Sequence, residues 1–307
     1  MQITRRQALL AAASAALGAG VTRRSVAAPA TKKVLFFTKS SGFQHSVIAR
    51  KGDELSHAEK ILVEIGKAAG FEVVPSKDGR MFDPDKIGQF DAFVFVTTGD
   101  LTTPGTDKQP PMSPEGEQAF YAAVKSGKGF VGMHCASDTF GHHRHRGADD
   151  PFIQLIGGEF SGHGAQQKAT ILVSDPAFPG ATAFGDKSFQ IEDEWYAQKH
   201  LANDLHVILT QQTEGMKGND YQRPNFPQTW ARKHGQGRVF YTSMGHREDV
   251  WDRKEYQDLI IQGLKWATGQ VEANIEPNIS TVTPEYDKVA GKGIFTPVEK
   301  VLKRAVK

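Results

Sequence analysis

The chain has 307 residues, of which 39% are hydrophobic and 23% charged, and its formal net charge is +2. This near balance excludes the dense positive surface on which nucleic-acid-binding proteins depend. A single cysteine excludes an intramolecular disulfide, so stability must come from a buried core, which a chain of this length can form.

The first 27 residues have the composition of a bacterial export signal. Arg5 and Arg6 precede an Ala/Leu-rich run that reaches Val21, and residues 25–27 supply the small side chains that a signal peptidase requires. Paired arginines are typical of the twin-arginine route, so we expect a periplasmic or secreted protein. The alternative is a cytoplasmic protein that starts with an apolar helix.

Removal of the signal changes the predicted charge and leaves no membrane segment. Cleavage after Ala27 removes four arginines and no acidic residue, which changes the net charge from +2 to −2. No other stretch is long and apolar enough for a membrane span. We therefore expect neither a nucleic acid nor a membrane as partner of the mature chain.

Residues 28–269 alternate short apolar segments with helical patterns, as a single α/β domain does. Buried strands are predicted at residues 33–38, 71–74, 91–97 and 130–133. Helical patterns between them end at Gly70 and Lys125. This spacing predicts parallel βαβ units in a doubly wound, mostly parallel sheet with helices on both faces.

The pattern changes after Asp150. Further strands are predicted, with no helix between them, at residues 168–173, 188–191, 206–210 and 229–232, which indicates an antiparallel extension. A last core strand at residues 238–243 precedes a helix from Asp252 to Thr268. Residues 270–307 are predicted to form a tail along the surface.

The strand at residues 130–133 ends in a group of chemically active side chains. His134, Cys135 and Asp138 follow it directly. In an open parallel sheet, ligands bind outside the carboxyl ends of the strands, so we expect a functional site here.

Three predicted core strands are each followed by a polar turn that contains a histidine: His45, His134 and His246. One such histidine alone is more often a helix cap or a hydrogen-bond partner in a loop. Three in the same register of a parallel sheet indicate a common pocket. Three histidines with an open position can also hold a divalent metal such as zinc, whose presence the sequence leaves open.

Two segments further along the chain add candidates. His163 follows several glycines, which allow a close approach to another surface but are also typical of a loop. Asp193 and Glu194 are candidate acids or bases, although neighbouring strand residues point to opposite faces, and a solvated acidic turn is the alternative. Trp195 and Tyr196 offer flat faces for a sugar ring.

The remaining aromatic, histidine and cysteine signals favour structural roles. Trp230 and Trp251 are predicted to be core residues. The histidine-rich segment His142–Arg146 is predicted to be a solvated loop, since the flanking glycines do not fix the geometry of metal ligands. Cys135 follows a strand as a nucleophile would, but His134 takes the turn position, and a cysteine hydrolase is kept only as an alternative.

Five separated motifs resemble those of the ThuA-like (trehalose-utilisation) family. They lie at residues 41–46, 127–134, 157–163, 193–196 and 237–246. The resemblance runs from about Lys33 to Gly269 and implies a class I glutamine-amidotransferase-like fold without the amidotransferase catalytic set. It also implies one pocket lined by His45, His134, His163, Asp193, Glu194 and His246. The loop His142–Asp149 has no match in it.

The family resemblance implies a role in the use of disaccharides and other glycosides, in some pathways through 3-keto sugars. We therefore expect an exported hydrolase or lyase with a small carbohydrate substrate, such as a 3-keto glycoside. In this hypothesis His134 or His45 is the base and Asp193 or Glu194 the acid. The substrate is bound by His163, His246, Trp195, Tyr196 and Asp138. A non-catalytic sugar-binding protein is the alternative, and the sugar, its linkage and the oligomeric state are left open.

Overall fold

The structure is a computed structural model that describes residues 31–141, 147–289 and 296–297. The predicted export signal, residues 142–146 of the histidine-rich segment and most of the last eighteen residues lie outside these ranges. Within them, no helix combines the length and the apolar character that a membrane span requires.

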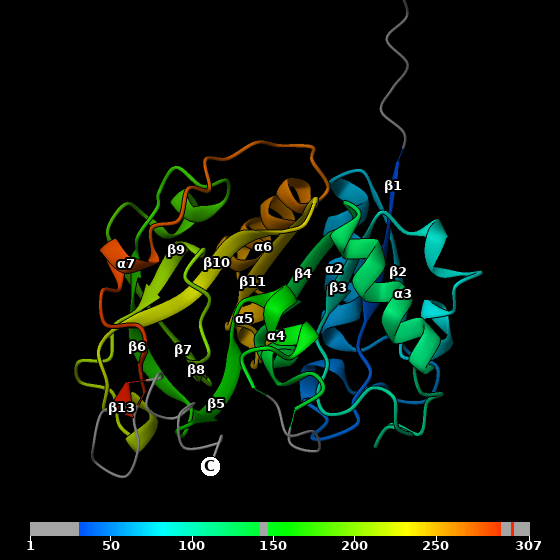
Figure 1. Cartoon of the computed structure of the whole chain (residues 1–307), viewed down its shortest axis with the longest axis horizontal. Helices are drawn as coiled ribbons and strands as arrows, with labels where there is room; N and C mark the ends of the chain where they lie inside the picture. The colour runs from blue at the N-terminus through cyan, green and yellow to red at the C-terminus, as the bar shows by residue number, and fades with distance from the viewer. Residues whose placement is uncertain (1–30, 142–146, 290–295, 298–307) are drawn as a thin grey trace, which may run out of the picture. The chain divides into compact units, whose positions relative to one another are not determined.

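A nine-stranded mixed sheet forms the centre of the domain (Figure 1), in the order β2-β1-β3-β4-β11-β10-β9-β6-β7. Its first five strands are mutually parallel: β2 (Phe71–Ser76), β1 (Lys32–Phe37), β3 (Ala92–Phe95), β4 (Gly129–Met133) and β11 (Gly237–Thr242). The other four are antiparallel: β10 (Phe226–His234), β9 (His206–Gln211), β6 (Gln167–Val173) and β7 (Ser188–Asp193). The predicted α/β fold with an antiparallel extension is confirmed.

Two small strand pairs lie outside this sheet. β5 (Glu159–His163) pairs with β8 (Tyr196–Lys199), and β12 (Lys288–Val289) pairs with β13 (Thr296–Pro297). The sequence analysis missed β5 and β8. The glycines of residues 157–164 favour a loop, and only the pairing of Glu159 with Lys199 and of His163 with Tyr196 makes this segment a strand.

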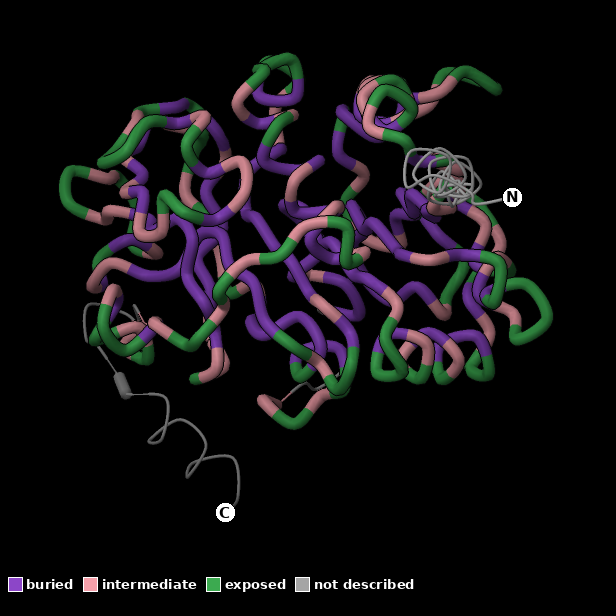
Figure 2. Tube along the Cα trace, turned by 90° about the horizontal axis from the view of Figure 1, so that it is seen from above, coloured by how far each residue is buried: buried purple, intermediate pink, exposed green. Residues whose placement is uncertain are grey.

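Helices cover both faces of the sheet and divide the core in two. On one face, α2 (His57–Ala68), α5 (Glu248–Trp251) and α6 (Lys254–Ala267) pack on alternate strand residues such as Val34 and Val131. On the other, α3 (Pro114–Lys125) and α4 (Pro151–Ile156) pack on their neighbours, such as Leu35 and Phe130. Buried residues accordingly run along the central strands in Figure 2. This double coverage explains why the parallel strands are continuously apolar.

The tail after α6 is attached to the sheet. The side-chain amide of Asn278 donates to the carbonyl oxygen of Val207 (3.0 Å) and accepts from its N–H (2.6 Å), as a neighbouring strand would. Ile279, the first residue of α7 (Ile279–Val282), is buried. This part of the tail therefore lies along the start of β9, beyond the residues that pair with β6.

A buried carboxylate connects the end of β1 to the start of α2. The fully buried Glu59 accepts hydrogen bonds from the Thr38 hydroxyl (2.6 Å), both sides of the Arg50 guanidinium (2.8 Å each) and the backbone N–H of Ser56 (2.9 Å). The Ser56 side chain accepts in return from the N–H of Glu59, which completes a capping box. The chain between these anchors, residues 39–55, contains His45.

We expect Glu59→Gln to lower the free energy of unfolding by about 3 kcal/mol, because it removes one partner of a buried ion pair. Burial alone would raise the pKa of Glu59, but the Arg50 and Thr38 hydrogen bonds lower it below its ordinary 4.5. A depressed folded-state pKa stabilises the protein above the unfolded-state pKa. The difference in free energy of unfolding between wild type and Glu59→Gln, measured by urea denaturation, should therefore be complete at pH 7 and should decrease below about pH 4.5. An unchanged difference at pH 3 would contradict this assignment.

Candidate functional site

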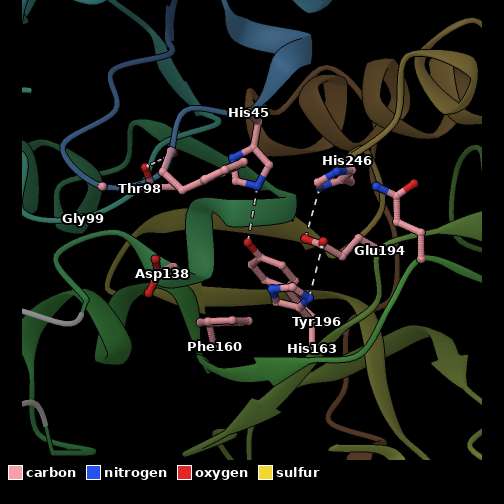
Figure 3. A pocket seen from close by; sticks show the side chains of 12 residues that line it. His45, Thr98, Gly99, Asp138, Phe160, His163, Glu194, Tyr196 and His246 are labelled. Carbon is pink, nitrogen blue, oxygen red and sulfur yellow. Dashed lines mark hydrogen bonds and ion pairs between the residues drawn. The ribbon is translucent and has the colours of Figure 1, made fainter. Parts of the chain in front are cut away.

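The carboxyl ends of the parallel strands face a cavity of about 390 Å³. It is lined by residues from six separate segments (Figure 3): Gly42, Phe43, His45, Thr98, Gly99, Asp138, Phe160, His163, Gln166, Glu194, Tyr196 and His246. Three histidines converge beside it. The ring centres of His45, His134 and His246 lie 5.0–5.1 Å apart in pairs, with interplanar angles of 80–88°.

His134 occupies a sharp turn at the end of β4. Its φ of 44° lies in the left-handed region, which costs a non-glycine residue about 1–3 kcal/mol. Two contacts offset this cost: the Tyr241 hydroxyl donates to the His134 carbonyl (2.8 Å), and Nδ1 of His134 donates to the carbonyl of Ser243 (2.9 Å). With Nδ1 used in this way, the lone pair of Nε2 is directed towards the cluster.

His246 follows a glycine that no other residue could replace without strain. Gly245 has a φ of 112°, and a Cβ added there would lie 2.3 Å from the hydroxyl oxygen of Tyr256. Its N–H donates to a carboxylate oxygen of Asp193 (2.7 Å). The turn after β11 is thereby fixed, and His246 is placed beside His134, with 3.2 Å between Nδ1 of His246 and Nε2 of His134.

Asp193 and Glu194 point to different sides of the chain, as adjacent residues at the end of a strand do. Asp193 is fully buried and accepts the N–H groups of Gly245 (2.7 Å) and Glu194 (2.9 Å) with its two oxygens. Burial, the largest influence, raises its pKa. Asp193 does not line the cavity, so the predicted role as acid or base is not supported; its contacts position Glu194 and the His246 turn instead.

Glu194 lies at the centre of the histidine cluster. Its Oε2 is 3.1 Å from Nδ1 of His246 and 3.7 Å from Nε2 of His134, and its Oε1 is 3.4 Å from Nδ1 of His163. Burial opposes ionisation of Glu194, but the neighbouring imidazoles of His134 and His246 bring its pKa well below the ordinary value. Burial likewise opposes charge on His246, yet the Glu194 carboxylate raises the pKa of His246.

The cluster has the dimensions of a metal site. One atom each from His45, His134, Glu194 and His246 lies within 4.8 Å of the others. Tetrahedral Zn²⁺ with bonds of 2.0–2.2 Å separates its ligand atoms by about 3.4 Å. The separations of 3.1, 3.2 and 3.7 Å among Glu194, His246 and His134 bracket that value. The Nδ1 hydrogen bond of His134 to a carbonyl is also the usual support of a histidine ligand.

His45 completes the cluster as a neutral imidazole. Burial, reinforced by the neighbouring His134 and His246, lowers its pKa to about 2. Its Nε2 lies 3.4 Å from the hydroxyl of Tyr196. Its Nδ1 is buried and has no hydrogen-bond partner among the described residues, so His45 retains a polar atom that a bound ion or ligand would satisfy.

The other predicted binding residues divide between the cavity and the core. His163, Tyr196 and Asp138 line the cavity, with the rings of His163 and Tyr196 stacked at 5.7 Å. Trp195 does not: it is fully buried, and its indole N–H donates to the carbonyl of Gln167 (2.8 Å). The prediction that Trp195 contacts a sugar is therefore not supported, because its indole packs in the hydrophobic core.

Four side chains around the cavity were not predicted from the sequence: Phe43, Thr98, Phe160 and Gln166. Phe43 could have been found, since it precedes His45 in the same motif. Phe160 and Gln166 lie on or beside β5, and only the β5–β8 pairing directs this segment towards the cluster. Trp230 and Trp251 are fully buried, as predicted.

Cys135 is fully buried and belongs to the core on the α6 side of the sheet. Burial, the main cause, raises the pKa of its thiol well above the ordinary value. A nucleophilic cysteine needs an accessible thiolate, and neither condition is met. The alternative of a Cys135 hydrolase is not supported.

We expect Cys135 in the folded protein to react with a soluble thiol reagent at least 100-fold more slowly than in urea-unfolded protein. The reagent cannot reach the buried thiol, and the raised pKa of the thiol disfavours the reactive thiolate. The measurement is the rate of chromophore release from an aromatic disulfide reagent. Rapid labelling of the native chain that also destroys activity would contradict this expectation.

The fold and site define a doubly wound α/β domain with a histidine cluster at the carboxyl ends of its parallel strands. The sequence profile of the ThuA family, described as trehalose utilisation, matches residues 33–267. This chain belongs to the ThuA family.

Solved structures support the assignment at the level of the fold. A putative ThuA-like protein from Parabacteroides merdae has a TM-score of 0.57 and 16% identity, covering 86% of this chain and 98% of its own. One from Bacteroides uniformis has a TM-score of 0.53 and 17% identity, covering 81% and 95%. No curated protein sequence matches this chain significantly.

Proposed function

We propose that the chain is a metal-dependent enzyme that acts on an oxidised sugar, most simply a 3-keto glycoside. The observation that carries this proposal is the convergence of His45, His134, Glu194 and His246 within 4.8 Å of one another beside a cavity. A binding protein would need polar and aromatic walls but no such set of metal ligands. A divalent ion held here would polarise a carbonyl oxygen of the substrate.

A 3-keto glycoside suits this site because its carbonyl acidifies the neighbouring C2–H bond. A base removes the C2 proton, and the electron pair forms an enolate. The enolate then expels the substituent at C1, whose oxygen leaves with the C–O electron pair and takes up a proton. The products are an unsaturated keto sugar and the free alcohol or second sugar, so no oxidant is required.

His163 is the group best placed to take the C2 proton. It lines the cavity with 41% of its side chain exposed, and it is not one of the four candidate metal ligands. Its Nδ1 donates to the Gly164 carbonyl (2.9 Å), which leaves Nε2 as the proton acceptor. Asp138, on the cavity wall beneath the end of β4, is the remaining carboxyl group available to return a proton to the leaving oxygen.

The deciding experiment is elemental analysis of the purified mature chain, followed by assays on trehalose and on 3-ketotrehalose. We expect one divalent ion per chain, release of glucose from the keto sugar, and none from trehalose. His163→Ala should retain the metal and lose about 100–1,000-fold in turnover. A metal-free protein that binds trehalose unchanged would establish the sugar-binding alternative and overturn the proposal.

Export to the periplasm is part of the proposal and rests on the sequence of residues 1–27. The test is the location of the full-length chain in cell fractions, with Arg5→Lys and Arg6→Lys together as the matched variant. Periplasmic protein that is lost in the variant would support the twin-arginine route. Equal amounts in the cytoplasm for both chains would refute it.

A further inference from the structure

Phe43 stands out from the rest of the cavity wall. Its side chain is 70% exposed, the one large hydrophobic residue exposed to this extent in the part of the chain that the structure describes. It lines the same cavity as the histidine cluster, and its ring lies edge-on to that of His45 with 5.0 Å between ring centres. An exposed phenylalanine at the mouth of a polar cavity offers an apolar face to the part of a bound ligand that extends out of the cavity.

The backbone that carries Phe43 is held firmly. The Thr98 hydroxyl donates to the Phe43 carbonyl (2.7 Å), and the Thr106 hydroxyl donates to the Gly42 carbonyl (2.9 Å). Gly99, with a φ of 70°, lets this loop come so close that an added Cβ would lie 2.6 Å from the Gly42 nitrogen. The loop that carries Phe43 is therefore held by hydrogen bonds to Thr98 and Thr106, while the Phe43 ring is exposed to solvent.

The other aromatic side chains lie deeper. Phe160 packs on Tyr196 with 4.1 Å between ring centres, and Tyr196 in turn lies 4.2 Å from His134. Figure 3 shows Phe160 beside Tyr196, on the opposite side of the cavity from His45. A sugar ring near the histidine cluster would meet Phe160 and Tyr196, and a second ring attached to it would extend past His45 towards Phe43.

We propose that Phe43 is a specificity-determining residue that forms the wall of an outer subsite, where it stacks on the second ring of a disaccharide-sized substrate. This inference rests on the proposed function and adds to it the size of the substrate. A pyranose has apolar C–H faces and polar edges, which suits an exposed aromatic face next to polar groups. Asp138, Gln166 and Thr98 supply such groups around the cavity.

The test compares metal-loaded wild type, Phe43→Ala, Phe43→Trp and Phe160→Ala with two substrates, 3-ketotrehalose and methyl 3-keto-α-glucoside. We expect wild type to prefer the disaccharide by at least tenfold in kcat/KM. Phe43→Ala should reduce that ratio about tenfold, and Phe43→Trp should preserve it. Phe160→Ala should weaken both substrates by similar factors, because it borders the inner ring.

Two results separate this inference from the proposed function. Metal content and cleavage in wild type, combined with a substrate ratio that Phe43→Ala leaves unchanged, would overturn the outer subsite alone. If the wild type shows no turnover, calorimetry measures how tightly wild type and Phe43→Ala bind trehalose and methyl α-glucoside. A preference of wild type for the disaccharide that Phe43→Ala abolishes supports the subsite. Equal affinities of wild type for the two sugars overturn it. Because Phe43 contacts the candidate ligand His45, the metal content of Phe43→Ala is also measured by elemental analysis. A loss of metal would show that the substitution acts through His45.

Discussion

His134→Ala should abolish high-affinity metal binding, lower the apparent affinity by at least 1,000-fold and eliminate turnover. His134 supplies Nε2 from a buried turn, where it lies 3.2 Å from His246 and 3.7 Å from Glu194. Alanine removes one of the four candidate ligand atoms from a fully buried position. Calorimetric titration with Zn²⁺ measures the loss.

Folding of His134→Ala must be followed separately, because the backbone at residue 134 is strained and Tyr241 donates to its carbonyl. Near-ultraviolet circular dichroism and the urea midpoint provide that control. His134→Gln is the matched variant, since it keeps the bulk and a polar atom but not the imidazole. Wild-type zinc affinity in either folded variant would refute the assignment of His134 as a ligand.

Glu194→Gln should weaken zinc binding at least 100-fold, although the side chain keeps its size. The carboxylate is the one negative group in direct contact with His134, His163 and His246 among the described residues. A neutral amide cannot compensate the charge of a divalent ion, and the Glu194 side chain is only 13% exposed, which limits compensation by solvent. Competition with a chromophoric zinc chelator measures the change.

The neighbouring Asp193→Asn is the natural comparison for Glu194→Gln. It is the same isosteric change one residue away, but on a carboxylate that accepts only backbone N–H groups. An amide still accepts one of these hydrogen bonds, so we expect a loss of about 10–100-fold through displacement of its neighbours. If Asp193→Asn were the more damaging of the two for metal binding, the assignment of ligand and positioning residue would have to be reversed.

Many features of the fold were predictable because they depend on local patterns. The helical pattern predicted to end at Lys125 is α3 (Pro114–Lys125), in which the N-cap Ser113 and a proline at the first position define the start. The strand before His134 was equally clear, because burial on both faces of a parallel sheet requires a run of apolar residues. The convergence of His45, His134 and His246 followed from parallel topology alone.

Local patterns could not show which of Asp193, Glu194 and Trp195 faces the cavity and which is buried in the core. The three residues are adjacent, and each is polar or aromatic, so the sequence makes all of them equally good candidates for the site. Their roles depend on which side of the chain faces the cluster, and that is determined where β7 ends and β8 begins. The same holds for Phe160, which reaches the cavity only through the pairing of β5 with β8.

The amino-acid sequence by itself determined the α/β architecture, the edge of the sheet at which the candidate site lies and the three histidines that gather there. These features depend on hydrophobic periodicity, which is local, and on the parallel βαβ topology that alternating strands and helices favour. Only the tertiary structure decided that Glu194 joins the histidines, that Asp193 supports them from the core, and that Phe43 stays exposed at the mouth of the cavity. Those outcomes depend on contacts between segments far apart in the chain, such as Asp193 with Gly245 and Phe43 with Thr98. There, burial and charge compensation select one arrangement among several that the sequence permits.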